Sequence, residues 1–245
     1  MKYYSIKILK NNIVWLFVDS KGQGILVDCG ESKPVLEFLK KHGIDLKYIL
    51  VTHYHYDHID GILDVALKTK AKVVGVKKQG KEEIIDIFVK DGDEINLLGE
   101  NIQIMNVKAH SDCDSIYYFR DKKFLITGDI IFSLGVGKIF EGSIQEMFKI
   151  IYKIRGMDKD ILIFCGHDLL NANFLFARDL LNVDYSLKKS CIQNKILDLP
   201  LKFGEEILIN PFFNYDNKFL KEKIGLINGD DFSVLKSLRE KKDKI

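Results

Sequence analysis

The sequence of 245 residues lacks long apolar runs, paired cysteines and an excess of charge of either sign. No apolar stretch approaches the ~18 residues that a membrane-spanning helix needs, and residues 1–9 alternate as a strand does, without the apolar core of a signal peptide. The four cysteines lie far apart and form no C-x-x-C pair, which predicts a reducing, cytoplasmic location. Basic residues number 37 and acidic residues 35, so we expect no nucleic-acid partner and no membrane partner.

What is present is the composition of an ordinary globular chain. Hydrophobic residues make up 47% and charged residues 29%, which excludes disordered and collagen-like structure. The length is sufficient to bury a sizeable core without disulfide or metal staples, and it predicts one or two domains. The sequence contains no internal repeats and no low-complexity tracts. We expect a monomer.

Strand and helix patterns alternate through the first two thirds of the chain and then give way to helices alone. Apolar runs predict buried strands over residues 48–51, 72–76 and 161–165. A helical periodicity predicts a helix over 143–154. Three further helices follow the last strand, over residues 171–181, 185–197 and 231–242. Pro200 and Pro211 mark an irregular stretch among them. The sequence therefore predicts an α/β domain over 1–168 and a smaller helical domain over 169–245.

A cluster of metal-binding residue types directly follows the strand predicted over 48–51. Its members are His53, His55, Asp57 and His58. Alternate residues at a strand end point to the same side, so His53 and His55 can share one metal. Where the chain then turns into a helix, Asp57 and His58 can face a second metal. Imidazole and carboxylate ligands suit zinc, and also iron or manganese, which favours a metal site over a solvated polar loop.

Further candidate ligands each follow another apolar strand. They are His110, Asp129 and His167. Taken alone, each is typical of a structural histidine or a turn residue, but one edge of a sheet or sandwich would gather them beside the first cluster. Asp28 also lies at a strand end, where two interpretations stay open: it orients the histidines or it forms a turn.

The order of these motifs resembles that of the metallo-β-lactamase superfamily, with T-H-x-H-x-D-H after a strand, a lone histidine, T-G-D and G-H. The resemblance implies an αββα sandwich with a two-metal site at one edge. The implied ligands of the first metal are His53, His55 and His110, those of the second are Asp57, His58 and His167, and Asp129 bridges the two. Asp57 and Asp129 are also the implied catalytic carboxylates, because their charge offsets that of the dications.

A closer resemblance is to glyoxalase II, the hydroxyacylglutathione hydrolase family. Three stretches carry it: T-G-D-I-I-F followed by G-V-G-K-I-F-E-G over 127–142, C-G-H followed by N-F-L-F-A over 165–177, and N-P-F-F over 210–213. The resemblance covers essentially the whole chain, including the helical domain that supplies part of the glutathione site in this family. It implies hydrolysis of glutathione thioesters, S-D-lactoylglutathione above all, by water activated between two divalent metals, with zinc preferred to iron or manganese.

A glutathione thioester carries two carboxylates, so its binding site needs cations. Lys138 follows a glycine-rich turn, and Arg239 and Lys242 are spaced i, i+3 on one face of the last predicted helix. By the resemblance, these three residues and Phe140 bind the substrate. Two alternatives stay open: Lys138 pairs with Glu141 on the surface, or the basic C-terminus is a solvated tail.

The chain departs from the family where hydroxyl groups are usual. Leu169 and Phe140 stand where family members often carry tyrosine, and Val136 replaces a cysteine. These departures leave the metal ligands intact but leave open which thiol is carried. The alternatives are a hydrolase for another thiol's ester and a mononuclear-iron persulfide dioxygenase. A lactonase or β-lactamase ranks lower because of the C-terminal helices and Lys138, and a non-catalytic relative because all seven ligands are present. A nuclease ranks lower because the net charge is near zero.

Overall fold

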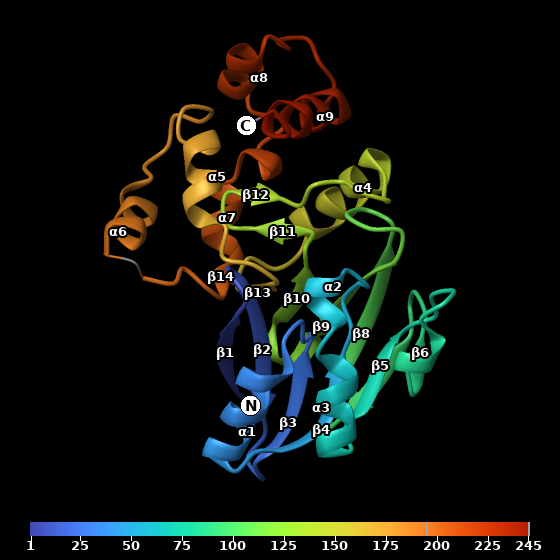
Figure 1. The fold of residues 1–245 in the computed structure, drawn as a ribbon. Coiled ribbons are helices and arrows are strands. Elements are labelled where there is room, and N and C mark those ends of the chain that lie inside the picture. Colours follow the sequence, from blue (N-terminus) through green and yellow to red (C-terminus); the bar gives the residue numbers. More distant parts are fainter. Residues whose placement is uncertain (195, 245) are drawn as a thin grey trace. The chain divides into compact units, whose positions relative to one another are not determined.

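The computed structural model describes residues 1–194 and 196–244, which form two compact units. The first unit contains Met1–Val107 and Cys113–Gly128, and the second contains Lys108–Asp112 and the chain from Asp129 onward. Figure 1 labels helices and strands of both units.

The first unit is built on a mixed sheet in which the strands follow chain order. Its strands are β1 (Lys2–Ile8), β2 (Asn12–Val18), β3 (Gln23–Val27), β4 (Asp45–Leu50), β5 (Lys72–Val76) and β6 (Ile87–Val89). The pairs from β1 to β3 are antiparallel, whereas those from β3 to β6 are parallel. Parallel strands need crossover connections, and helices supply two of them. The carboxyl ends of β3 and β4 therefore lie at the same edge of the sheet.

A second group of strands in this unit forms an antiparallel meander. They are β7 (Glu94–Leu97), β8 (Glu100–Val107), β9 (Asp114–Phe119) and β10 (Phe124–Gly128), and the short 3₁₀ helix η2 (Arg120–Lys122) connects the last two. The two sheets pack face to face: the ring of Phe17 on β2 stacks on Phe119 of β9, with centroids 5.5 Å apart. The Tyr117 hydroxyl donates to the Val51 carbonyl at 2.7 Å. Every residue of β2 is buried, because both faces of its sheet are covered.

Helices cover the other face of the first sheet (Figure 1). They are α1 (Ser32–His42), the single turn α2 (Tyr56–Ile59) and α3 (Ile62–Thr69), and the 3₁₀ turn η1 (Glu82–Ile84) precedes β6. Val35 and Leu39 of α1 pack into one apolar core with Leu16 of β2 and Val65 of α3. This core fixes the strand ends from which the candidate ligands emerge.

The second unit is mainly helical. Its elements are β11 (Ile131–Phe132), β12 (Gly135–Val136), α4 (Ile144–Arg155), β13 (Leu162–Cys165), α5 (Leu170–Ala177), α6 (Ser186–Asn194), β14 (Leu201–Lys202), α7 (Phe203–Ile209), η3 (Pro211–Phe213), α8 (Lys218–Ile224) and α9 (Asp231–Lys242). The strands form two antiparallel pairs, β11 with β12 and β13 with β14. Ser143 caps α4 by accepting from the Glu146 amide at 3.2 Å.

The predicted elements are mostly found. The helix expected over 231–242 has those bounds, and the helix expected over 143–154 is α4. The helix expected over 185–197 ends earlier, at Asn194, and residue 195 within that range lies outside the described residues. The stretch expected to be irregular contains α7, and α8 was not predicted. No helix in the described parts of the chain has both the length and the apolar character that crossing a bilayer requires.

Candidate metal centre

The first unit brings three of its histidines together just beyond the end of β4. The ring centroids of His53 and His55 are 4.7 Å apart, and those of His53 and His58 are 4.1 Å apart. His53 and His58 are buried, and α2 carries Asp57 and His58 in one turn. The carboxylate oxygen Oδ2 of Asp57 lies 3.6 Å from Nε2 of His58. All four candidate ligands of this unit are therefore adjacent.

Asp28 organises this cluster from the end of β3. Its buried carboxylate accepts hydrogen bonds from the Thr52 amide at 2.8 Å, the Thr52 hydroxyl at 2.6 Å and Nδ1 of His58 at 2.9 Å. A carboxylate can only accept here, so Nδ1 of His58 is the protonated nitrogen and Nε2 carries the lone pair. Asp28 thus orients a histidine, and its φ of 57° shows that it also forms the turn after β3, so both interpretations of this residue hold.

Thr52 fixes the neighbouring histidine in the same way. Its hydroxyl proton is donated to Asp28, so the oxygen accepts from Nδ1 of His53 at 3.0 Å. Nε2 of His53 is then the unprotonated nitrogen. Sequence reasoning did not assign Thr52 a role. Its position between the strand and the first histidine was the only signal.

The second unit places one carboxylate oxygen beside two imidazoles. Oδ2 of Asp129 lies 3.1 Å from Nε2 of His167 and 3.7 Å from Nε2 of His110. Nδ1 of His110 donates to the backbone carbonyl of Lys138 at 2.6 Å, which again leaves Nε2 as the nitrogen with the lone pair. The three candidate ligands of this unit are thus adjacent too.

The loop after β12 leaves no space for a side chain at Gly137. A Cβ atom at this position would lie 1.9 Å from the Asp129 carbonyl oxygen and 3.3 Å from Nδ1 of His110. Glycine allows the loop to pack directly on the backbone of one candidate ligand and the ring of another. The next residue, Lys138, is thereby held where its carbonyl meets His110.

The side chains of Lys138 and Phe140 lie exposed above this loop. The Lys138 ammonium is 5.5 Å from the centroid of the Phe140 ring, and the Phe140 ring is 5.3 Å from that of His110. Phe140 is 59% exposed, so its apolar ring is available for contact with a bound molecule. In the described part of the chain, Lys138 contacts the face of Phe140 rather than a carboxylate.

Arg239 is an anchor of the second unit. It is 5% exposed, its Nη1 donates to the carbonyls of Val136 at 2.8 Å and Gly137 at 3.3 Å, and its Nη2 donates to Asp243 at 2.9 Å. These bonds exclude a solvated tail at this residue. They also engage much of the guanidinium with the protein itself, which the sequence pattern did not predict.

Lys242 lies one helical turn further along the same face. Its Nζ is 3.5 Å from the Val136 carbonyl oxygen and 5.9 Å from the centroid of the Phe212 ring. Burial, together with the positive charge of Arg239, lowers the pKa of Lys242 to about 7. A carboxylate from a bound molecule would raise that pKa and stabilise the ammonium.

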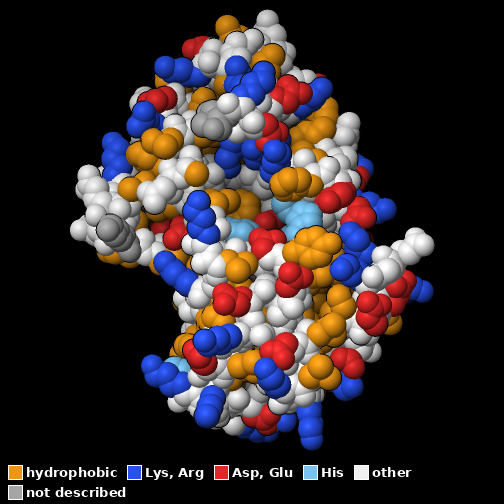
Figure 2. All heavy atoms as spheres, in the orientation of Figure 1, with side chains coloured by type: hydrophobic (Ala, Val, Ile, Leu, Met, Phe, Trp, Pro, Cys, Tyr) orange, Lys and Arg blue, Asp and Glu red, His pale blue; other side chains and the backbone are white. Residues whose placement is uncertain are grey.

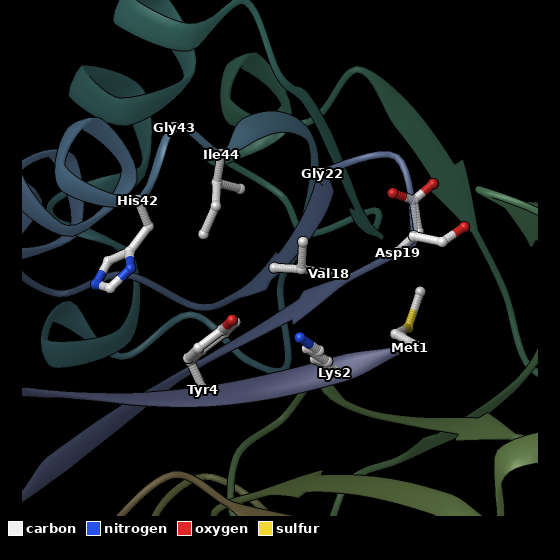
Figure 3. Close-up of a pocket in the computed structure, with 10 residues that line it drawn as sticks. Met1, Lys2, Tyr4, Val18, Asp19, Gly22, His42, Gly43 and Ile44 are labelled. Atoms are coloured by element: carbon white, nitrogen blue, oxygen red, sulfur yellow. The ribbon is translucent and has the colours of Figure 1, made fainter.

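The surface carries charges of both signs (Figure 2), and a pocket opens on the first unit. Lys and Arg side chains are interspersed with Asp and Glu over the face drawn in Figure 2. A pocket of about 430 Å³ opens at the end of the first sheet opposite to His53. Figure 3 draws residues that line it, among them Lys2, Tyr4 and His42. The His42 ring lies against Phe38, with centroids 4.3 Å apart, as expected of a structural histidine. None of the candidate ligands lines this pocket.

The donor set within each unit fits a metal ion. Nδ1 of three histidines is engaged by the protein, so Nε2 is presented in His53, His58 and His110. This arrangement is typical of metal-binding histidines, whose second nitrogen donates to a carboxylate or carbonyl. Carboxylates complete the set, which suits divalent zinc, iron or manganese.

Comparison with known proteins accounts for almost the entire chain. Residues 10–167 match the family model of the metallo-β-lactamase superfamily, and residues 169–245 match that of the hydroxyacylglutathione hydrolase C-terminus. A curated hydroxyacylglutathione hydrolase from Pelagibacter ubique is 32% identical over 98% of this chain and 99% of its own length. One from Hamiltonella defensa is 31% identical over 100% of both chains.

Solved structures share the fold. ETHE1 from Myxococcus xanthus is 17% identical with a TM-score of 0.67, and covers 99% of this chain and 98% of its own. The B3 metallo-β-lactamase BLEG-1 is 16% identical with a TM-score of 0.69, and covers 86% of this chain and 99% of its own. The chain belongs to the metallo-β-lactamase superfamily. Within it, the chain is a member of the hydroxyacylglutathione hydrolase family.

Membership confirms two predictions made from the sequence. The fold is the αββα metallo-β-lactamase sandwich followed by a helical C-terminal region. The family match, together with the groups of histidine and aspartate side chains, supports divalent-metal binding. The role of each individual residue stays a prediction.

Proposed function

We propose that this protein hydrolyses glutathione thioesters, with S-D-lactoylglutathione converted to D-lactate and glutathione as the main reaction. The observation that carries the proposal is the match of residues 169–245 to the hydroxyacylglutathione hydrolase C-terminus, joined to a histidine and aspartate donor set. Relatives that bear this name align over nearly their full length. We assign metal binding and catalysis to residues 1–168, and glutathione binding to residues 169–245 together with Lys138 and Phe140 of the first range.

Two divalent metals, with zinc preferred, would be held by seven side chains. The ligands we assign are His53, His55 and His110 to the first metal, Asp57, His58 and His167 to the second, and Asp129 to both. When bound, metals in such a site lower the pKa of water and polarise a carbonyl group. Asp57 and Asp129 supply negative charge that offsets the dications.

Other residues of the chain orient the imidazoles and line the site. Asp28, Thr52 and the Lys138 carbonyl fix the imidazole tautomers, so little reorganisation is required when substrate binds. The leaving group is a thiolate, so a strong general acid is unnecessary. The exposed Phe140 ring offers an apolar wall beside His110.

The substrate carboxylates would be bound by the cations of the second unit. Lys138 is exposed and can reach a carboxylate of glutathione, and the carboxylate nearest in sequence to Lys242, that of Asp243, accepts a hydrogen bond from Arg239. Arg239 positions the backbone of the same loop and adds positive charge. In this proposal, Lys138, Lys242 and Arg239 all act on the glutathione part of the substrate.

The direct test is a comparison of thioesters on protein whose metal content is measured in the same sample. We expect hydrolysis of S-lactoylglutathione to exceed that of the corresponding esters of coenzyme A and of a simple thiol. If the ester of another thiol is hydrolysed faster, that thiol and not glutathione is the carrier. Oxygen consumption with glutathione persulfide, on protein holding one iron per chain, would favour the dioxygenase alternative instead.

A pH dependence of substrate affinity follows from Lys242. Its pKa of about 7 means that the ammonium is progressively lost as the pH rises through neutrality, and a neutral amine does not attract a carboxylate. We expect KM for S-lactoylglutathione to rise above pH 7, by up to about tenfold per pH unit. Lys242→Arg keeps its charge at these pH values and should flatten this rise. A KM of the wild type that is constant from about pH 6 to 9 would contradict the assignment.

A further inference from the structure

Asn12 is a buried amide at a place where the chain turns at the surface. It is the first residue of β2, directly after the turn from β1, yet it is only 5% exposed. Leu9, at the start of the same turn, is 55% exposed. The side chain of Asn12 is therefore directed into the unit, where burial of an amide costs free energy unless the amide is hydrogen-bonded.

The Nδ2 group of Asn12 donates twice to one residue. Nδ2 donates to Oδ2 of Asp57 at 2.8 Å and to the backbone carbonyl of Asp57 at 3.2 Å. One donor group thus spans the carboxylate and the main chain of the same residue. Such a bridge restricts the rotation of the Asp57 side chain about its own backbone.

The Asp57 backbone is itself held from another side. A Cβ atom on Gly30 would lie 2.0 Å from the Asp57 carbonyl oxygen, so the chain after β3 packs directly on this peptide. The Cys29 amide also donates to the carbonyl of His58 at 2.7 Å. With its main chain fixed by these contacts, Asp57 retains mainly its side-chain torsions, and Asn12 acts on those.

The chemistry of an amide suits this task. A lysine or arginine at position 12 would neutralise Asp57 and compete with a metal for it, whereas an amide orients the carboxylate and leaves its charge intact. Asn12 pairs with Ile8 in the register of β1 and β2, and its Nδ2 group is directed to Asp57.

We infer that Asn12 is a positioning residue that holds the Asp57 carboxylate in the orientation in which it binds a divalent metal. The inference rests on the proposed function, because Asp57 is a ligand in that proposal. Outer partners of metal ligands typically contribute roughly 10- to 100-fold to metal affinity. We expect Asn12→Ala to lower affinity for one zinc ion by an amount in that range.

The experiment is a zinc titration of metal-free protein, with the melting temperature of each metal-free variant as the measure of folding. Asn214→Ala is the matched control, because its amide also spans two acceptors, the carbonyls of Ile207 at 2.9 Å and Asn210 at 3.0 Å, but in the second unit. We expect that control to change stability without changing zinc affinity. If Asn12→Ala does not fold, Asn12→Ser, which has a shorter side chain, serves in its place.

A double-mutant cycle with Asp57→Ala separates positioning from general support of the fold. In the Asp57→Ala background, Asn12→Ala should change zinc affinity less than about twofold, since the ligand it orients is gone. An equal loss in both backgrounds, or a wild-type zinc affinity in Asn12→Ala, would overturn the inference. A wild type that binds zinc but does not cleave glutathione thioesters would overturn only the proposed function.

Discussion

Asp129→Ala is expected to lose bound metal and thioesterase activity together. One oxygen of this buried carboxylate lies 3.1 Å from Nε2 of His167 and 3.7 Å from Nε2 of His110. A bridging ligand serves both metals, so its removal should lower metal affinity by more than the roughly 10- to 100-fold that is typical of losing an outer partner of a ligand. Metal content by elemental analysis and kcat with S-lactoylglutathione, measured on one preparation, check this result.

Asp121→Ala provides the matched control for this experiment. Asp121 is an exposed aspartate in η2, so its loss removes the same charge without touching a candidate ligand. It should retain metal and turnover. If Asp129→Ala also retained near-normal metal and near-normal turnover, the two-metal assignment would be wrong.

Lys138→Ala should lower kcat/KM for S-lactoylglutathione by about 10- to 100-fold, since a charged hydrogen bond contributes about 1.5–3 kcal/mol. The effect on an uncharged thioester should be much smaller, because that substrate offers no carboxylate. The substitution should not disturb His110, because His110 is held by the backbone carbonyl of residue 138, which alanine also provides. Metal content should therefore stay at the wild-type value.

The control for Lys138 is another exposed lysine of the same unit. Lys149 pairs with Glu146 at 2.6 Å on the surface of α4, and Lys149→Ala should leave both substrates unaffected. An equal drop for the charged and the uncharged ester in Lys138→Ala would instead mean that this side chain supports the fold or the metal site.

The candidate ligands could be predicted from the sequence because a metal site needs particular side chains at strand ends. The spacing of His53, His55 and Asp57 along one short segment is enough to place them together. Their partners could not be predicted in the same way. Thr52 and Asn12 act through hydrogen bonds whose geometry depends on how the strands pack.

The elements that were missed are short. The helices α7 and α8 each span seven residues, which is two turns and too little for a clear periodicity, and packing within the second unit stabilises them. For Arg239, the sequence predicted a cation at the substrate, whereas its hydrogen bonds to Val136 and Gly137 depend on tertiary structure. A basic side chain alone does not reveal whether its partner is a ligand or a carbonyl.

Because His110 donates to the Lys138 carbonyl, support of this candidate ligand and contact with the substrate depend on different parts of residue 138. The candidate ligand His110 depends on the main chain at position 138, whereas in the proposed function the substrate contacts the side chains at positions 138 and 140. A library randomised at these two positions can therefore explore new thiol carriers while keeping this support of the metal centre. In evolution, the same separation would let a lineage change its carrier thiol by substitutions that leave the hydrolytic machinery intact.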